Sequence, residues 1–390
     1  MRSHIKKTSL IHREITAKEV CSISLFLIVN FIFSIKYFAR YTSYYLPIVF
    51  ALMCFHIVLF CRRGGRIMQD RYILIANVLL LSCFCIACVF LWSKISAESL
   101  NVDRWSVITS FWDYFFSGQY VYYALSHLGN YPGPMPFYFI LALPFYFIGE
   151  LGILSLAGIV LFFLLVKTEK FDSSTCSLVI LLLIMTSPFY LWEVLVRSNI
   201  FFNSTLILYS LVVFLRIKNY NTLKSCFVMG VIMGLLLSTR NVFALCYIVF
   251  FLYSIKARRL TITSAFKVGL IAISTFVATF LPFIVGFWDE FLYMNPFVIQ
   301  SSFLMPFGWV LAAILISIPI SFFCKEDHDL FFYCGLVLFT TILLYAMYHI
   351  INSSVYDSLI KESLIDVSYF ILCIPFFLYY ILVEELDGER

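Results

Sequence analysis

The sequence predicts an all-α, polytopic bundle of transmembrane helices, and three observations lead to this class. The chain of 390 residues is 62% hydrophobic but only 13% charged, whereas about 25% of the residues in a soluble domain are charged. Its mean hydropathy is +0.96. Apolar runs of about 20 residues recur, the length with which an α-helix crosses about 30 Å of hydrocarbon. The alternating strands of a membrane β-barrel are not seen in the sequence.

Thirteen apolar segments follow one another, and we interpret them as about 12 crossings with both termini in the cytoplasm. They form one membrane domain over 1–390. Two added helices occupy 1–71, a catalytic-type core occupies 72–260, and further helices occupy 261–390. No small-residue cleavage site follows the first run, which favours a retained helix over a signal peptide. The segments lie at 20–38, 44–61, 72–93, 135–149, 151–166, 177–192, 201–215, 225–239, 242–255, 268–287, 303–323, 330–350 and 364–383.

Four basic clusters predict which side of the plasma or inner membrane is cytoplasmic, because positively charged loops remain inside. The loop 94–134 and the turn 193–200 then lie outside, and all six tryptophans fall at or near the outer interface. Two loops on one side require an even number of crossings between them, but three segments lie there. Either 135–149 or 151–166 does not cross fully, or a boundary is misplaced. The basic clusters are Arg2, Lys6, Lys7, Arg13 and Lys18; Arg62, Arg63, Arg66 and Arg71; Arg216 to Lys224; and Lys256, Arg258 and Arg259.

The outer loop 94–134 contains an amphipathic interfacial helix, expected at about 102–118. Its apolar side chains recur at steps of three and four residues, as in a helix that lies on a membrane surface. Its polar face offers Arg104, Ser106, Thr109 and Asp113. Asp103 stands at its start, which leaves two interpretations open. Asp103 is either the N-cap of a surface helix or a catalytic carboxylate that takes a proton from an attacking hydroxyl group.

The motifs around this helix resemble those of the glycosyltransferase C superfamily over about residues 72–260. The residues Asn101-Val-Asp-Arg-Trp105 follow an apolar segment, and Tyr131-Pro-Gly-Pro-Met-Pro-Phe137 opens the next one. The second motif is similar to the Tyr-Pro-Pro of the polyprenol-phosphate-mannose-dependent family 87. Further along, the stretch from Trp192 to Asn203 is similar to an outer loop of that family, with Ser198-Asn199 in place of its Gly-Gln. The glycines Gly230 and Gly234 precede Arg240, which resembles a Gly-rich helix ending in a cation near the donor phosphate.

The resemblance implies an enzyme that transfers a sugar from a polyprenyl-phosphate lipid donor to a glycan or lipid acceptor in cell-envelope synthesis, with inversion at the anomeric carbon. Asp103 would be the general base. The donor phosphate would bind Arg240, together with Arg197 or Arg104. The substrate pocket would include Asp113, His127, Tyr131, Asn199, Asn203 and Asn241. Simpler alternatives are that Arg240 extends to the interface and that Arg104 forms a salt bridge with Asp103.

We expect no cofactor, no metal and no nucleic-acid partner. The chain has no Walker loop, dinucleotide fingerprint or zinc-binding spacing, and its cationic residues lie in short orienting loops. Cys83, Cys85 and Cys88 fall within an apolar run and are interpreted as buried apolar thiols. Two other functions remain open. An O-antigen or capsule polymerase or ligase usually has a large outer loop in the second half of the chain, whereas the loops 288–302 and 351–363 are short here. A transporter or flippase of lipid-linked sugars would show internal symmetry.

Overall fold

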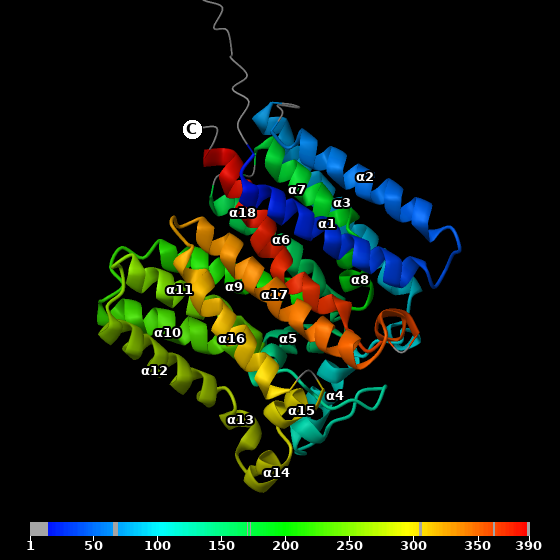
Figure 1. The fold of residues 1–390 in the computed structure, drawn as a ribbon. Coiled ribbons are helices and arrows are strands. Elements are labelled where there is room, and N and C mark those ends of the chain that lie inside the picture. Colours follow the sequence, from blue (N-terminus) through cyan, green and yellow to red (C-terminus); the bar gives the residue numbers. More distant parts are fainter. Residues whose placement is uncertain are drawn as a thin grey trace, which may run out of the picture.

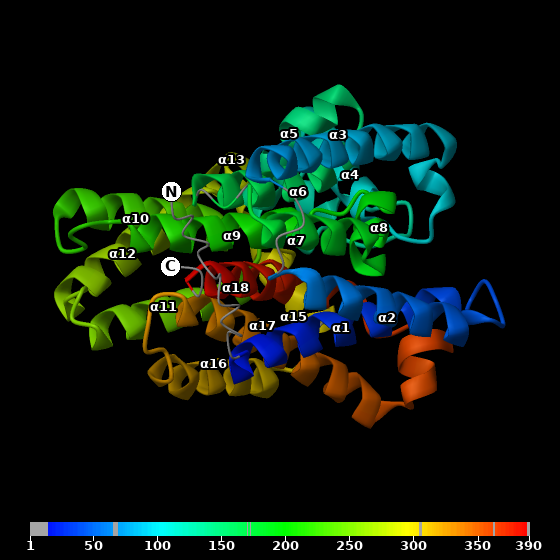
Figure 2. The same ribbon diagram turned by 90° about the horizontal axis from the view of Figure 1, so that it is seen from above.

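The structure is a computed structural model that describes residues 15–64, 69–169, 171, 173–303, 306–361 and 363–387. Over these residues the chain forms α-helices and short 3-10 or π-helical turns without a β-strand, so the all-α class is confirmed. Helices α10 and α12 lie at one side of the bundle and α2 and α3 at the other, with α17 and α18 between them (Figures 1 and 2). Five basic residues of the predicted cytoplasmic clusters lie outside the described residues: Arg2, Lys6, Lys7, Arg13 and Arg66.

The helices have the following bounds. They are α1 (Ala17–Phe38), α2 (Tyr45–Arg62), α3 (Asp70–Lys94), α4 (Arg104–Phe116), α5 (Pro136–Ile148), α6 (Gly152–Thr168), α7 (Thr175–Thr186), α8 (Pro188–Leu195), α9 (Ile200–Leu215), α10 (Leu223–Leu237), α11 (Ala244–Lys256), α12 (Ile262–Ala278), α13 (Leu281–Ile284), α14 (Trp288–Tyr293), α15 (Pro296–Phe303), α16 (Phe307–Phe322), α17 (Asp329–Asn352) and α18 (Ile374–Asp387). The short turns are η1 (Ala97–Ser99), η2 (Val121–Tyr123), η3 (Asn241–Phe243), η4 (Asp357–Lys361) and η5 (Val367–Cys373).

Among the described residues, six helices are long and apolar enough to cross a membrane. The pairs α5–α6 and α7–α8 are bent by 117° and 59°, and the number rises to eight if each pair is one broken span. Four more apolar helices have 10–17 residues. A membrane-embedded protein is therefore supported, whereas 12 crossings are not confirmed, because several of the predicted segments fold as short or bent helices. The six spans are Ala17–Phe38, Tyr45–Arg62, Asp70–Lys94, Ile262–Ile284, Asp329–Asn352 and Val367–Glu385.

The amphipathic helix predicted at 102–118 is present as α4, and α5 packs against it. The indole nitrogen of Trp112 donates to the carbonyl of Phe139 at 3.1 Å, and the Tyr146 hydroxyl donates to Asp113 at 2.6 Å. The rings of Phe111 and Phe139 stack with centroids 3.7 Å apart. Both ends of α5 therefore lie beside α4.

Two glycines let α10 approach α12 closely, and this contact positions the end of α10. A Cβ atom at Gly234 would lie 2.4 Å from the Ala272 carbonyl oxygen, and one at Gly230 would lie 2.6 Å from the Cβ of Ile271. Just after α10, the Ser238 hydroxyl bonds that of Thr279 at 2.6 Å. It also accepts the backbone N–H of Phe137 at 3.2 Å. The residues that follow Ser238, including Arg240, are thus tied to both α12 and α5.

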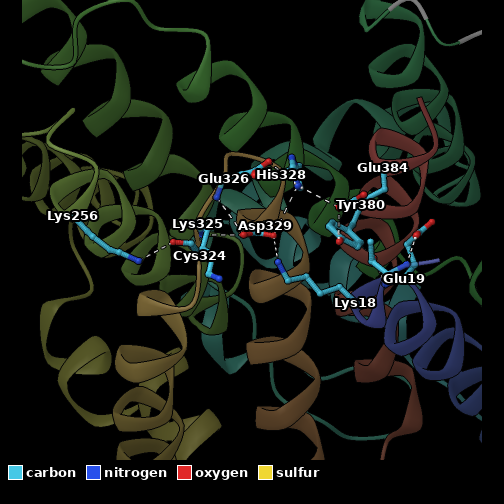
Figure 3. A network of polar contacts seen from close by, with 11 residues as sticks. Lys18, Glu19, Lys256, Cys324, Lys325, Glu326, His328, Asp329, Tyr380 and Glu384 are labelled. Carbon is cyan, nitrogen blue, oxygen red and sulfur yellow. Dashed lines mark hydrogen bonds and ion pairs between the residues drawn. The ribbon is translucent and has the colours of Figure 1, made fainter. Parts of the chain in front are cut away.

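A polar network joins the ends of α1, α17 and α18 (Figure 3). Asp329, which is 2% exposed, pairs with Lys18 and accepts the backbone N–H groups of Lys325 and Glu326 at 2.8 and 3.2 Å. His328 lies 3.3 Å from a carboxylate oxygen of Glu384. Asp329 is the first residue of α17 and Glu384 lies near the last turn of α18, so the network fixes one end of these helices. Of these helices, α17 also carries Thr341, Ile342 and Tyr345, which line the site described next.

Candidate functional site

A cavity of about 790 Å³ lies where α4, α5, η3, α15, α17 and η5 meet. One part of its wall is polar or charged, and the other is apolar. The polar part comprises Asn101, Asp103, Arg104, Asn130, Tyr131, Tyr138, Arg240, Asn241, Gln300, Thr341, Tyr345, Ser363, Asp366 and Tyr369. The rest comprises Val107, Leu128, Gly133, Pro134, Val242, Ile299, Ile342, Leu364 and Leu372. Of the predicted site residues, the structure thus brings together Asp103, Arg104, Tyr131, Arg240 and Asn241.

Asp103 occupies the N-cap position of α4, but its side chain makes no capping hydrogen bond. Its Oδ2 atom instead accepts the Ser126 hydroxyl and the Asn130 side-chain amide, each at 2.7 Å. No described residue donates a hydrogen bond to Oδ1. Both partners of Asp103 are neutral, no described residue forms a salt bridge with its carboxylate, and one carboxylate oxygen stays free at the cavity wall. The capping interpretation of Asp103 is therefore wrong as far as its side chain is concerned.

Arg104 is paired with Asp366, not with Asp103 as the salt-bridge alternative supposed. Its guanidinium group contacts the Asp366 carboxylate and donates to the Ser368 hydroxyl at 2.8 Å. The guanidinium carbon also lies 5.7 Å from the centre of the Tyr369 ring, within the range of a cation–π contact. The salt bridge to Asp103 does not form because η5 brings a second carboxylate to the guanidinium group.

Asp366 was not found by sequence reasoning, yet it is held by several groups. Its Oδ1 atom accepts the Ser368 backbone N–H at 3.0 Å and the Ser368 hydroxyl at 2.6 Å. The Lys36 ammonium group donates to the neighbouring Ile365 carbonyl at 2.7 Å. Burial raises the pKa of Asp366, but Arg104, the bonds from Ser368 and the charge of Lys36 lower it, and the pKa lies below its usual value. Asp366 is therefore an anion whose charge is compensated by Arg104.

Arg240 is the cation of the cavity that remains unpaired. Its guanidinium carbon lies 5.4 Å from the centre of the Tyr138 ring and 5.9 Å from that of Tyr369. Its Nε atom is buried without a hydrogen-bond partner, and it forms no ion pair with any residue that the structure describes. Aromatic faces attract a cation but do not neutralise it. The positive charge is thus available to an anion that enters the cavity.

Amide groups close the wall next to Arg240. The Asn241 side-chain nitrogen donates to the Gln300 side-chain oxygen at 2.8 Å. The Gln300 nitrogen donates to the Gly133 carbonyl at 2.7 Å. This chain of bonds joins η3, α15 and the loop before α5, and it includes Asn241, one of the predicted pocket residues. Tyr131, another of them, lies in the same loop and is partly exposed.

Five predicted site residues lie outside this cavity: Arg197, Asp113, His127, Asn199 and Asn203. Arg197 is buried, bonds Glu150 at 3.2 Å and donates to the carbonyls of Ile95 and Leu195, so its charge is compensated away from the cavity. Asp113 accepts the Tyr146 hydroxyl on the far side of α4.

His127 bonds the Ser106 hydroxyl at 2.7 Å and stacks on Trp105, which holds the loop against α4. Asn199 and Asn203 are buried at the start of α9. None of these three side chains lines the cavity.

The described residues contain no group of three or more His, Cys, Asp or Glu side chains that could hold a metal ion. The described cysteines are free thiols. Cys88 is buried and Cys85 partly buried, but Cys83 is exposed, so the prediction of burial is wrong for Cys83.

The cavity offers acid–base and ion-pair chemistry from Asp103 and Arg240. Comparison with models of protein families, with curated proteins and with solved structures yields no match.

Proposed function

We propose that this protein is a membrane glycosyltransferase that transfers a sugar from a polyprenyl-phosphate donor to a hydroxyl group of a glycan or lipid acceptor. One observation carries the proposal. A single cavity holds, beside an apolar wall, a carboxylate and a guanidinium group that form no salt bridge within the described part of the chain, Asp103 and Arg240. The prenyl chain of such a donor matches the apolar wall, and its phosphate group matches Arg240. The acceptor hydroxyl group, which loses a proton as it reacts, matches Asp103.

The reaction places each group in a defined role. As the acceptor oxygen bonds to the anomeric carbon, its proton passes to the free oxygen of Asp103, which acts as general base. The bond between the anomeric carbon and the phosphate oxygen breaks, and its electron pair leaves with the polyprenyl phosphate. The negative charge that grows on the phosphate is stabilised by Arg240. Direct displacement inverts the configuration at the anomeric carbon.

The apolar wall of the cavity suits the lipid part of such a donor. Ile299 comes from α15, Ile342 from α17, and Leu364 and Leu372 from the segment around η5. These side chains line the same cavity as the unpaired Arg240, so a prenyl chain on them could present its phosphate to the cation. In this proposal the cavity faces the outer side of the cell membrane and both termini are cytoplasmic.

The base role is tested with Asp103→Asn in the purified protein, supplied with a panel of polyprenyl-phosphate sugars and oligosaccharide acceptors. We expect transfer to fall by about 10²–10⁴-fold, the usual contribution of a general base. Asn retains an oxygen that accepts the Ser126 and Asn130 bonds, so the fold should persist. Asp113→Asn is the matched control, because Asp113 lies on the same helix outside the cavity; it should retain transfer.

The outcomes separate enzyme from transporter. Retention of transfer within about tenfold in Asp103→Asn contradicts the base role. A donor that crosses the bilayer of a proteoliposome unchanged, with no transfer to any acceptor, would support the transporter alternative and overturn the enzymatic one.

A further inference from the structure

A second polar cluster lies behind the wall of the cavity, in a part of the protein that is almost fully buried. It comprises Glu193 at the end of α8, Ser198 and Asn199 in the turn, and Asn203 in the first turn of α9. These residues are 0%, 1%, 2% and 1% exposed. Polar side chains so deeply buried are ordinarily hydrogen-bonded, so the partners of these four decide what the cluster does.

The turn between α8 and α9 is built to hold this cluster in place. Arg197 adopts a left-handed backbone conformation with φ of 54°, and the N–H of Ser198 donates back to the Glu193 carbonyl at 2.9 Å. Oε1 of Glu193 accepts the N–H of Phe201 at 2.9 Å, which satisfies a free amide at the start of α9. Asn199 stands at the N-cap position of α9 but makes no capping bond. Its side chain is thus left for another partner.

Six polar atoms of the cluster are buried and lack a hydrogen bond of good geometry to any described residue, although the Ser198 hydroxyl interacts with the Glu193 carboxylate and the Asn199 amide with the Tyr138 hydroxyl. They are Oε2 of Glu193, Oγ of Ser198, and both side-chain amide atoms of Asn199 and of Asn203. Asn199 and Asn203 are four residues apart, so their side chains lie on the same face of α9. The six atoms include donors and acceptors, which is the combination that hydroxyl groups need, since each hydroxyl donates one hydrogen bond and accepts others.

Tyr138 separates this cluster from the cavity. Its ring lines the cavity and supports the Arg240 guanidinium group. Its hydroxyl group faces the side-chain amide of Asn199 and lies within electrostatic range of Glu193. A second link runs through Ser204, whose hydroxyl donates to the carbonyl of Leu372, another cavity residue. The cluster is therefore one side chain away from the point where an anion would meet Arg240.

We propose that Glu193, Ser198, Asn199 and Asn203 form a sugar-recognition subsite that opens to the cavity when the Tyr138 side chain moves. This inference rests on the proposed function. The sugar of the donor is bonded directly to the phosphate, so a phosphate held by Arg240 places the sugar next to Tyr138. Arg240 then binds the phosphate, and the amides of α9 select the sugar by its hydroxyl groups.

Binding measurements on the full-length protein in detergent separate these two roles. The probes are farnesyl phosphate, farnesol and a panel of farnesyl-phosphate hexoses. In the wild type, farnesyl phosphate should bind more tightly than farnesol, and at least one hexose should tighten binding further by about tenfold or more, which corresponds to one or two additional hydrogen bonds. In Asn203→Leu the hexose gain should fall below about threefold while the affinity for farnesyl phosphate stays unchanged. Arg240→Gln should weaken farnesyl phosphate itself.

Thr205→Val is the matched control, since Thr205 is also buried on α9 but its hydroxyl already bonds the Phe201 carbonyl at 2.8 Å; it should retain the hexose gain. Asn203→Leu should unfold at the same or a higher temperature than the wild type, because Leu replaces two unsatisfied polar atoms with an apolar group of similar size. If Asn203→Leu does not fold, Asn199→Leu tests the same gain.

Two negative results have different meanings. If farnesyl phosphate binds no better than farnesol, the proposed function fails and the subsite fails with it. If farnesyl phosphate binds as expected but the hexose gain survives in the folded Asn203→Leu and Asn199→Leu variants, the subsite is overturned and the phosphate site stands.

Discussion

The ion pair between Arg104 and Asp366 should stabilise the protein more than an exposed pair does, and Asp366→Asn tests this. The side chains of Arg104 and Asp366 are 14% and 35% exposed, so the pair stands between two limits. Exposed pairs contribute about 0–1 kcal/mol, whereas removal of one partner from a fully buried pair costs about 3–5 kcal/mol. Because Asn keeps an oxygen for the Ser368 bonds, we expect the free energy of unfolding to fall by about 2 kcal/mol.

Unfolding of the purified protein in mixed detergent micelles, followed by tryptophan fluorescence, measures this free energy. Asp327→Asn is the matched control, because Asp327 also binds one arginine, Arg259, and one hydroxyl group, that of Tyr253. The side chains of that pair are 41% and 42% exposed, so the loss should stay below about 1 kcal/mol. Equal losses in the two variants would refute the reasoning that burial strengthens the Arg104–Asp366 pair.

Three further predictions concern the packing of α10, the ion pair of the buried Arg197, and pH. Gly234→Ala should cost about 1–3 kcal/mol of stability, since its Cβ atom would press on a backbone carbonyl of α12. Gly269→Ala, with no atom within 4 Å of its Cβ, should be neutral or stabilising by up to about 1 kcal/mol; thermal unfolding compares them, and equal effects contradict the close contact. Arg197→Gln leaves the Glu150 carboxylate without its partner and should lower stability by about 2–3 kcal/mol, while the affinity for farnesyl phosphate, measured in the same preparation, stays unchanged. The lowered pKa of Asp366 means that its pair stabilises the fold above about pH 4 and loses effect as pH falls through the folded pKa. The free-energy difference between wild type and Asp366→Asn should therefore shrink on acidification, and a growing difference in unfolding experiments at pH 3–6 contradicts this assignment.

The sequence was sufficient for the helical class and for the location of α4. Apolar residues at steps of three and four predicted a helix at about 102–118, and the structure has α4 at Arg104–Phe116. Composition alone predicted the membrane environment, because so much apolar surface cannot be buried in a soluble core of this length. The number of crossings was not accessible in this way. Hydropathy shows where a chain is apolar but not whether a segment is straight, and α5 and α6 meet at 117°.

The contacts of α5 favour an answer to the odd number of segments between the two outer loops. α5 begins directly after the loop that contains α4, and its last turn bonds α4 through Tyr146. Just beyond it, Glu150 pairs with Arg197 in the turn 193–200. Both ends of α5 thus lie on one side of the molecule. This arrangement favours the first alternative of the sequence analysis, in which 135–149 does not cross fully, because an even number of segments then lies between the loops.

The candidate site was predicted in part, and the residues that were missed have a common reason. Asp103, Arg240 and Tyr131 belong to motifs that are local in the sequence, so their grouping could be expected. Asp366 contacts Arg104 across a separation of 262 residues, and it stands at the edge of an apolar run where no motif surrounds it. An acidic residue at the predicted outer end of an apolar segment was the signal available for it. Single-sequence patterns do not pair such distant residues, whereas in the fold the start of η5 contacts the start of α4.

The charges of the cavity explain why two of its four ionic groups are paired and two are not. Arg104 and Asp366 neutralise each other, which removes both from direct competition for a ligand. Asp103 is held by a hydroxyl and an amide, and Arg240 by two aromatic rings, so neither has an oppositely charged partner among the described residues. In the proposed reaction the proton that leaves the acceptor neutralises Asp103 while the departing phosphate gains a negative charge beside Arg240. The proton transfer brings positive charge to Asp103, and the bond cleavage brings negative charge next to Arg240, at the same stage of the reaction. Both changes occur in the transition state and not in the bound substrates, so these two groups stabilise the transition state more than the substrates.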